Sequence, residues 1–398
     1  MTLMTRWTSP ARALRPLVLV GLLAGTLAGC SEDNTTEPAP IPGATLSLIP
    51  NLRAEDISAD GASILLTDPF SATSDFYFYD VASNTSTLKG QAGDAAFDFT
   101  TGISNAGRVS AIHGKPENAG LWQEGAGWQD LGSIYANGCE YDADTGNQDL
   151  SSAWDIDSAG HTTVGLIWNL CNSEAFLWTD AAGAGNFVAL DLIGDGDSTS
   201  GSPASNRATV VSDDGTMVGG FASAYANVGG ATYWIDRRPA IWTASGVGSL
   251  VPSNGVFTDD SPGEVLAISG NGAVVTGVWA QMPFIWSATL GTINVASGAY
   301  EGYVGYGQAT ALNGQVVYGT LTEGFFGLPF PFFWTQAGGV VSLLDVAAAN
   351  GITLPENYYW EAVVAASADG TIIVGAAYDE TFTLNTYVLK VPASIYGL

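Results

Sequence analysis

The stretch that decides the fold is Ser367-Ala368-Asp369-Gly370-Thr371-Ile372-Ile373-Val374-Gly375, in which an apolar approach meets a tight turn and an apolar run ending in glycine. Asp-Gly and Asn-Gly are strong short-range signals of a β-hairpin, because the favoured two-residue turns need positive φ at their central residues. Each copy lies between two short apolar runs and so predicts two antiparallel strands. The signal occurs seven times, at Ser58–Gly61, Ser104–Gly107, Asp157–Gly160, Ser212–Gly215, Ser269–Gly272, Ala311–Gly314 and Ser367–Gly370.

A second signal, an aromatic strand, follows most of these hairpins. It is clearest in Phe332-Phe333-Trp334-Thr335 and weakest in the last unit, as Tyr387-Val388-Leu389. A fourth apolar run follows in most units, and the units repeat every 42 to 57 residues from turn glycine to turn glycine. Four antiparallel strands at this period are typical of propeller blades, which must stack to bury both faces. The sequence therefore predicts an all-β fold, a seven-bladed β-propeller of four-stranded antiparallel blades.

The two ends of the chain indicate how the ring closes. After the third strand of the last unit only residues 392–398 remain, and they begin with proline, which is poor material for a strand. Residues 44–49 precede the first unit and have no partner within it. We expect this N-terminal segment to supply the outer strand of the seventh blade, which would remove the exposed edges of an open ring.

The repeat has a recognisable family form. Units that read Ala-x-x-x-Ser-x-Asp-Gly-x-x-Val-x-Gly, followed by Phe-x-Trp-Thr, resemble the HAF-type extracellular repeats of bacterial surface and secreted proteins. The resemblance covers nearly all of residues 50–391. The best copy of the eponymous His-Ala-Phe reads Glu174-Ala175-Phe176, and no copy carries the histidine. The resemblance implies an architecture and an extracellular setting; it implies no reaction or ligand, since propellers host many functions.

The N-terminus reads as a targeting segment. Arginines at 6, 12 and 15 precede an apolar run over 17–27, which is too short to span a bilayer comfortably and fits a secretory signal peptide. Leu27-Ala28-Gly29-Cys30 resembles the bacterial lipoprotein processing box, in which the cysteine becomes the lipidated first residue. An ordinary signal peptide that contains a cysteine is the alternative.

This resemblance sets the expected domain boundaries and location. Residues 1–29 would be the signal peptide, 30–43 the lipidated cysteine with a polar, Pro-rich tether, and 44–398 the propeller. Ser31 after the cysteine favours, by the habit of that family, the outer membrane or cell surface, with the periplasmic or exterior side left open.

The net charge of the chain limits the classes of molecule that it can bind. The chain carries 11 basic and 39 acidic residues, a net charge of −28; loss of residues 1–29 removes three arginines and no acids, which leaves −31. Because a surface with this much negative charge repels the phosphates of nucleic acids, we expect no nucleic-acid partner. We expect a monomer that binds a basic partner or cations, or that is merely kept soluble by its charge.

Catalytic motifs are missing from the sequence, and calcium is the one cofactor that it suggests. There is no Gly-x-Ser-x-Gly elbow, His-Glu-x-x-His or phosphate loop. Asp142, Asp144 and Asp149 alternate along a turning loop, as hard cations require, and Asp191–Asp197 is a weaker second loop. Neither loop has the terminal bidentate glutamate of a full calcium loop, so two plain solvated acidic loops are the alternative.

Two cysteines remain once Cys30 is assigned to the lipid. Cys139 and Cys171 are an even pair in an oxidising compartment, and both flank the third unit. We predict that they form a disulfide.

These observations favour a non-catalytic, lipid-anchored envelope propeller that presents loops to a protein or glycan. The alternatives are a secreted propeller enzyme acting on polysaccharide and a purely structural envelope component. An enzyme of that kind would need a pair of carboxyl groups in a cleft. Candidate binding contacts, each of which could instead pack within or between blades, are the aromatic residues Tyr135, Tyr141, Tyr225, Trp279, Phe325 and Phe326.

Overall fold

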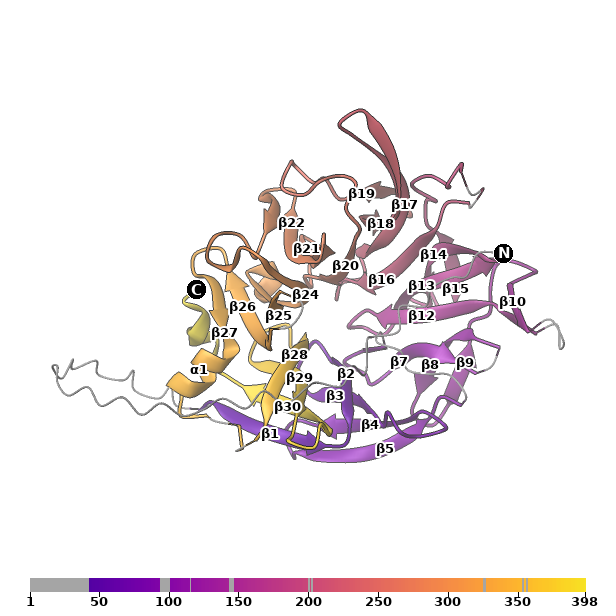
Figure 1. Cartoon of the computed structure of the whole chain (residues 1–398). Helices are drawn as coiled ribbons and strands as arrows, with labels where there is room; N and C mark the ends of the chain where they lie inside the picture. Colours follow the sequence, from indigo (N-terminus) through magenta and orange to yellow (C-terminus); the bar gives the residue numbers. More distant parts are fainter. Residues whose placement is uncertain are drawn as a thin grey trace, which may run out of the picture. The chain divides into compact units, whose positions relative to one another are not determined.

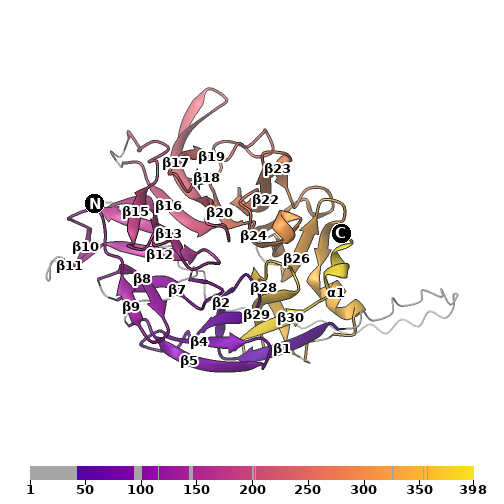
Figure 2. The same ribbon diagram turned by 180° about the vertical axis from the view of Figure 1, so that it is seen from behind.

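A computed structural model describes residues 43–93, 101–114, 116–142, 147–199, 201, 203–324, 327–352, 354–355 and 357–398. These residues belong to one compact unit, a ring of seven four-stranded antiparallel sheets (Figures 1 and 2). The predicted seven-bladed propeller is confirmed.

Blades one to six each use four strands that are consecutive along the chain. Blades one to three are β2 (Arg53–Ile57), β3 (Ser63–Thr67), β4 (Asp75–Asp80) and β5 (Thr85–Gln91); β6 (Gly102–Ile103), β7 (Val109–His113), β8 (Asn118–Gln123) and β9 (Gly127–Asp130); and β12 (Ser151–Ile156), β13 (Thr162–Asn169), β14 (Asn172–Thr179) and β15 (Asn186–Ala189). Blades four to six are β16 (Asn206–Val211), β17 (Met217–Val228), β18 (Ala231–Thr243) and β19 (Gly248–Leu250); β20 (Gly263–Ile268), β21 (Val274–Trp279), β22 (Met282–Ser287) and β23 (Gly291–Asn294); and β24 (Tyr303–Ala311), β25 (Val316–Glu323), β26 (Pro329–Thr335) and β27 (Gly339–Ser342).

The seventh blade closes the ring with both ends of the chain. Its sheet order is β1 (Thr45–Pro50), β30 (Leu384–Lys390), β29 (Ile372–Tyr378) and β28 (Tyr359–Ala366). Strand β1 pairs antiparallel with β30, from Thr45 opposite Lys390 to Pro50 opposite Asn385. Figure 1 shows the indigo β1 beside the yellow β30. The predicted closure by the N-terminal segment is confirmed.

In the part of the chain that the structure describes, few regular elements lie outside the blades. A hairpin of β10 (Cys139–Asp142) and β11 (Asn147–Asp149) precedes blade three, and helix α1 (Leu343–Ala349) follows β27. Ser342 caps α1, since its side chain accepts hydrogen bonds from the backbone N–H groups of Leu344 and Asp345. Three short 3₁₀ turns complete the set, η1 (Gly298–Tyr300), η2 (Leu312–Gly314) and η3 (Ala393–Tyr396).

The repeated turn differs from the predicted geometry. In the Ser367–Gly370 copy only the glycine has positive φ (70°), whereas a two-residue hairpin turn would need it at Asp369 as well. The buried Ser367 hydroxyl instead donates to Asp369 Oδ1 (2.7 Å) and accepts from the N–H of Ile372 (3.1 Å). The serine thus fixes a wider turn. The sixth copy has alanine in that place, and there Leu312 and Asn313 also adopt positive φ.

Neighbouring turns are joined by hydrogen bonds around the ring. The connections run from Asp60 N to Asn105 Oδ1, Asn105 N to Ser158 O, Ser158 N to Asp213 O, Asp214 N to Gly270 O, Leu312 N to Ala368 O, and Ala368 N to Ala59 O. Between blades five and six the Thr310 hydroxyl donates to Ile268 O at 3.0 Å. The repeat therefore organises a contact between blades as well as a hairpin within each.

The third-strand tryptophans pack against the preceding blade. Trp122 of blade two lies edge-on to Phe76 of blade one, with 5.2 Å between ring centroids. Trp242 of blade four is fully buried in a cluster with Val164 and Leu177 of blade three. Large rings are suited to this task because each buries about 150–250 Å².

Candidate functional site

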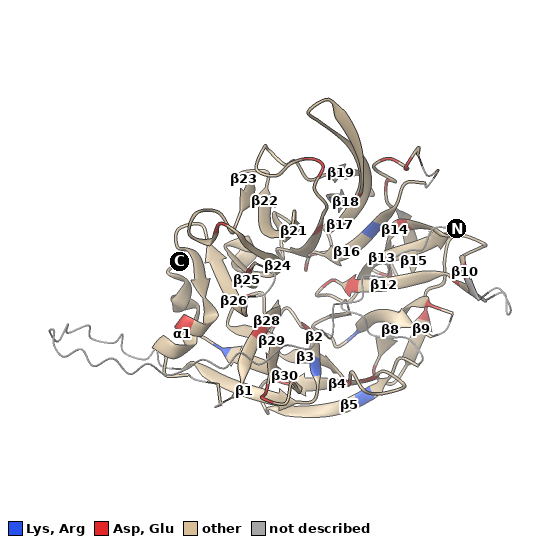
Figure 3. Cartoon of the chain, in the orientation of Figure 1, with Lys and Arg blue, Asp and Glu red and all other residues tan. Residues whose placement is uncertain are grey.

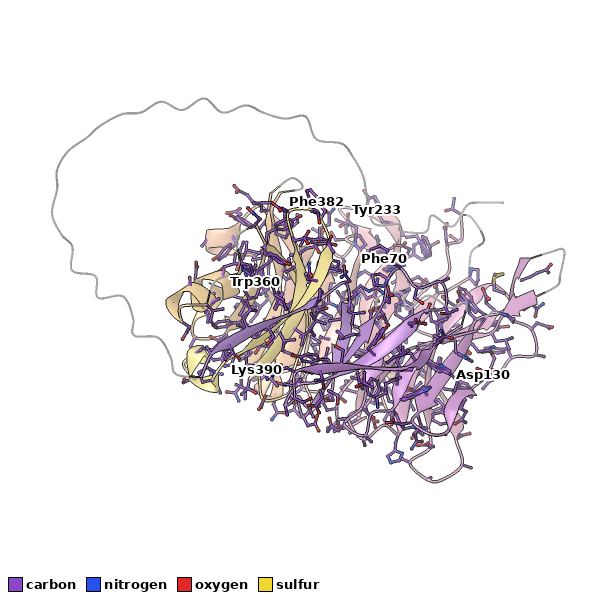
Figure 4. The ribbon with its side chains drawn as sticks, turned by 90° about the horizontal axis from the view of Figure 1, so that it is seen from below. Phe70, Asp130, Tyr233, Trp360, Phe382 and Lys390 are labelled. Carbon is purple, nitrogen blue, oxygen red and sulfur yellow. A yellow bond between two sulfur atoms is a disulfide. The ribbon has the colours of Figure 1, made fainter. Side chains whose placement is uncertain are left out.

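The antiparallel strand order gives the ring two different faces. The first strand of each blade ends at the Ser-x-Asp-Gly turn, so these turns share one face, which we call the turn face. The connections from second to third strand, and from each blade to the next, lie on the other, which we call the loop face. Figure 4 shows Phe382 and Tyr233 along one edge of the ring, which is the loop face. Lys390, the last residue of the third strand β30, lies toward the other edge, which is the turn face.

Exposed apolar side chains gather on the loop face. Among the described residues, twelve large apolar side chains are exposed. Eight belong to loop-face connections, namely Phe70, Ile134, Leu170, Leu192, Val256, Leu328, Leu344 and Phe382, and Tyr233 lies near the start of β18, close to its turn with β17. Phe70, Leu328 and Phe382 are 79%, 74% and 76% exposed. Each belongs to a connection between a second and a third strand. Apolar groups concentrated on one face mark interaction surfaces more often than scattered ones do.

An apolar groove lies on the same face between helix α1 and blades six and seven. Its volume is about 400 Å³. The groove is lined by Leu328, Pro329, Phe330, Leu344, Ala347, Ala348, Ile352, Leu354, Tyr358, Tyr359 and Trp360. Tyr359 stacks on Tyr378 (5.9 Å) and meets Phe382 edge-on (6.1 Å), so an aromatic cluster borders the groove.

The channel of the ring forms a second site, of opposite character. About 160 Å³ of it admits water-sized molecules, and it is lined by first strands from every blade. Its lining includes four acids, Glu55, Asp56, Asp155 and Asp213, and no lysine or arginine among the described residues. Acidic residues far outnumber basic ones around the ring (Figure 3).

Asp56 and Asp155 are partly buried in the channel and bridge successive blades. Asp56 Oδ2 accepts the N–H of Ile103 in blade two (2.9 Å), and Asp155 Oδ2 accepts the N–H of Val211 in blade four (2.8 Å). Burial, with smaller contributions from the nearby Asp213 and Glu55, raises the pKa of Asp56 to about 7, although backbone hydrogen bonds from Ile103 and Ile57 act to lower it. Burial and the nearby Asp56 raise the pKa of Asp155 well above its ordinary value. The pair therefore holds a proton near neutral pH.

Of the other two channel acids, Glu55 and Asp213, Glu55 is neutralised by an ion pair. Its Oε1 accepts the Nε of Arg53 at 2.7 Å and also contacts the Thr67 hydroxyl. Glu264, near the start of blade five, is likewise paired, with Arg207 (2.6 Å) and Arg237 (3.2 Å). Asp56 and Asp155 have no such ion pair within the part of the chain described by the structure.

The predicted calcium loops fall on the loop face, and their described carboxylates serve the fold. Asp149 Oδ1 accepts the N–H of Glu117 at 2.9 Å, and the backbone of Asp142 pairs with Asn147. Asp144 lies outside the described residues. In the second loop Asp195 Oδ2 accepts the N–H of Tyr225 at 3.2 Å. Across the residues that the structure describes, no group of three or more His, Cys, Asp or Glu side chains is arranged to hold a metal ion.

The predicted aromatic contacts have different fates. Trp279 is wrong as an exposed contact: it is fully buried, stacks on Phe257 at 5.2 Å and donates from Nε1 to Ser261 O. Tyr135 is half-buried, and its hydroxyl is bonded to Glu174. Tyr141 lies in β10, with its side chain outside the description, and Phe325 and Phe326 lie outside the described residues altogether.

The predicted disulfide is confirmed between Cys139 and Cys171, 32 residues apart. It ties the start of β10 to the tip of the β13–β14 hairpin, where the N–H of Leu170 also donates to Asn137 O at 3.2 Å. The bridge thus holds the exposed Leu170 in place on the loop face.

The sequence reasoning missed two features. The loop-tip residues Phe70 and Phe382 carried a signal, since each is a large apolar residue among turn-forming polar ones. Asp56 and Asp155 carried another, because both stand two residues before a repeated turn, where other units have apolar or small residues. Acids in a strand that must line the channel call for an explanation.

Comparisons with known proteins identify the fold. No protein-family model matches the chain, and no curated protein matches its sequence. Among solved structures, the oligogalacturonate lyase of Vibrio parahaemolyticus is 11% identical over 88% of this chain and 98% of its own, with a TM-score of 0.51. An oligogalacturonate lyase in complex with manganese is 12% identical over 88% and 92% of the two chains, with a TM-score of 0.50. The β-propeller domain of the Trilobed protease from Pyrococcus furiosus, which has an open velcro topology, is 7% identical over 86% and 94%, with a TM-score of 0.50.

These likenesses show the propeller fold alone. The chain differs from the open topology of the last of these structures, since β1 closes its seventh blade. Within the described residues, none of the helices has the length and apolar character needed to cross a bilayer.

Proposed function

We propose that this chain is a non-catalytic, lipid-anchored propeller of the bacterial envelope, of the HAF-repeat type, that binds a protein partner on its loop face. The observation that carries the proposal is the concentration of exposed apolar side chains on that face, with Phe70, Leu328 and Phe382 in connections between second and third strands. Such residues become the buried anchors of protein interfaces, where a few side chains supply most of the binding energy.

The position of the N-terminal strand supports an orientation in which the loop face is turned away from the membrane. Gly43 lies on the turn face, where it lines the same shallow hollow as Gly61 and Thr371. A tether that follows a lipidated Cys30 would therefore reach the propeller on its turn face. The loop face would then point away from the membrane and be free to meet a partner.

A protein is favoured over a glycan by the chemistry of this face. Its exposed anchors include Leu170 and Leu328, which are aliphatic, and the groove beside α1 is lined mainly by carbon. Sugar-binding surfaces need hydroxyl partners as well as flat rings.

The test compares two triply substituted chains. The loop-face variant carries Phe70→Ser, Leu328→Ser and Phe382→Ser. The control carries Leu88→Ser, Val247→Ser and Leu398→Ser, three exposed apolar residues that lie outside the loop-face connections. Crosslinking in intact envelopes should identify a protein joined to the wild-type and control chains and not to the loop-face variant. When the chain and its crosslinked partner are purified, the loop-face variant should bind the partner at least tenfold more weakly than the wild-type chain does.

Equal affinity of both variants would refute the loop face as the binding surface. Binding of an envelope polysaccharide in place of a protein, lost in the same variant, would keep the face and replace the partner. Anchoring is tested separately: Cys30→Ser should move the protein from the membrane fraction to the soluble fraction, and an unchanged distribution would refute the lipid anchor.

A further inference from the structure

The channel contains an unusual imbalance of charge. Four carboxyl groups line it and, among the described residues, no basic side chain does. Glu55 is neutralised by Arg53, yet Asp56 and Asp155 have no ion pair within the described part of the chain. A buried carboxylate without a counter-charge is costly, so natural proteins usually pair it or keep it protonated.

The fold brings these two acids together on either side of one short strand. Asp56 accepts the N–H of Ile103, the last residue of β6. Asp155 touches the preceding residue, since a Cβ added to Gly102 would lie 2.5 Å from Asp155 Oδ1. Acids from blades one and three thus flank the same strand of blade two, and Gly102 leaves space for Asp155.

A second, independent observation points to a ligand. The Thr101 hydroxyl, next to Gly102, lines the same channel, is only 5% exposed and has no hydrogen-bond partner among the described residues. The indole Nε1 of Trp154, which also lines the channel, is similarly unpartnered. Buried polar atoms are nearly always satisfied in folded proteins, by protein or by a bound molecule.

Part of the channel wall is apolar, although Thr209, Gln308 and Thr310 also line it. Blades five and seven contribute Leu266, Ala267, Val364 and Ala365 to its wall. The space of about 160 Å³ has room for roughly ten water molecules, since each water needs about 10–15 Å³ of accessible volume. It therefore suits a small molecule or the end of one side chain, with a polar head on one side and a hydrocarbon on the other.

We propose that the channel binds a primary alkylammonium group at Asp56, Asp155 and Thr101, with its hydrocarbon against the apolar wall. An ammonium group has three N–H donors and no acceptor, which matches two carboxyl groups and a hydroxyl oxygen. It supplies the charge that the pair lacks. A metal ion fits less well, because no described group of three acidic, histidine or cysteine side chains is arranged to hold one.

The source of the ammonium group is either a free amine or a lysine side chain of a bound protein. The test uses n-butylammonium and N-acetyl-lysine amide as the two probes, with tetramethylammonium, which has no N–H donor, and calcium as controls. Binding is measured by titration calorimetry and by melting temperature, at matched ionic strength, on the purified protein at pH 8 and pH 5.

We expect n-butylammonium to bind at pH 8 and to bind at least tenfold more weakly at pH 5, where the carboxyl pair is protonated. Asp56→Asn and Asp155→Asn should each abolish the binding, while Glu380→Gln, a change at an exposed loop-face acid, should leave it intact. Circular dichroism and a cooperative melt identify variants that are folded. If N-acetyl-lysine amide binds as well, the channel admits a lysine side chain; if only the alkylamine binds, it takes a free amine.

Three results would overturn the proposal: no heat and no shift of the melt with n-butylammonium, equal binding by tetramethylammonium, or equal binding by the folded Asp56→Asn variant. A calcium response that depends on Asp56, without a response to the amine, would also overturn it. These outcomes do not depend on the loop face, so the two proposals succeed or fail separately.

Discussion

The Asp56 carboxyl group gives the sharpest test of the channel energetics, because its replacement should stabilise the protein. The amide side chain introduced by Asp56→Asn keeps an oxygen that can accept the N–H of Ile103, at nearly the same size. The substitution removes the ionisable group whose charged form the channel disfavours. We expect the variant to be more stable than wild type above neutral pH and about equally stable near pH 4.

The magnitude follows from the pKa of Asp56, which rises from 3.8 to about 7 on folding. The folded protein then binds more protons than the unfolded chain between these values, so the free energy of unfolding falls as pH rises through this window. At roughly 1.4 kcal/mol for each pH unit the ceiling is about 4 kcal/mol. Because Asp56 is partly exposed to channel water, we expect Asp56→Asn to raise the free energy of unfolding by about 2 kcal/mol above neutral pH, which is less than that ceiling.

The assay is urea denaturation of wild type, Asp56→Asn and Glu380→Gln at three pH values, one acidic, one slightly acidic and one above neutrality. Mutual repulsion among 39 acidic residues tilts every profile in the same direction, so the decisive quantity is the difference between each variant and wild type. That difference should grow with pH for Asp56→Asn and stay near zero for Glu380→Gln. A difference that does not grow with pH, or a variant less stable than wild type throughout, would refute the assignment of a raised pKa to this group.

Three further changes test the fold. Replacing Cys139 and Cys171 by serine removes a bridge across 32 residues and should lower the free energy of unfolding by about 3–4 kcal/mol; urea midpoints measure this, and a loss below about 1 kcal/mol would contradict the chain-entropy account. Ser367→Ala removes the hydroxyl that organises a buried turn and should cost about 1–3 kcal/mol in the same assay, whereas no loss would show that the backbone alone fixes the turn. Gly102→Ala places a methyl group 2.5 Å from Asp155 Oδ1 and should cost about 1–3 kcal/mol; an unchanged melting temperature would show that the strand moves freely.

Much of the architecture is readable from local signals. The turn of Ser367–Gly370 and the strand around Trp334 recur because every blade solves the same problem, a hairpin followed by a strand that packs on its neighbour. The count of seven follows from counting turns. Ring closure can be predicted by counting strands, because the N-terminal end of the chain has a strand without a partner and the last unit lacks its fourth strand.

Local signals were less informative about turn geometry and about exposure. Asp369-Gly370 predicts a hairpin correctly but not its type, because the buried Ser367 hydroxyl favours a wider turn. Trp279 was expected to be a binding contact, yet Phe257 and Arg238 enclose its ring. Whether an aromatic residue near a strand end is exposed depends on loops that come from elsewhere in the chain.

The sequence by itself determined the blade, its number and the closure, because hairpins and strand patterns depend on residues close together in the chain. Only the tertiary structure decided the faces and the channel. Asp56 and Asp155 are separated by a whole blade and meet because the ring curves their strands around one axis. Phe70 and Phe382, at opposite ends of the sequence, share a face because antiparallel strand order sends every such connection to the same side. The two proposed sites therefore depend on the closing of the ring, which no single repeat encodes.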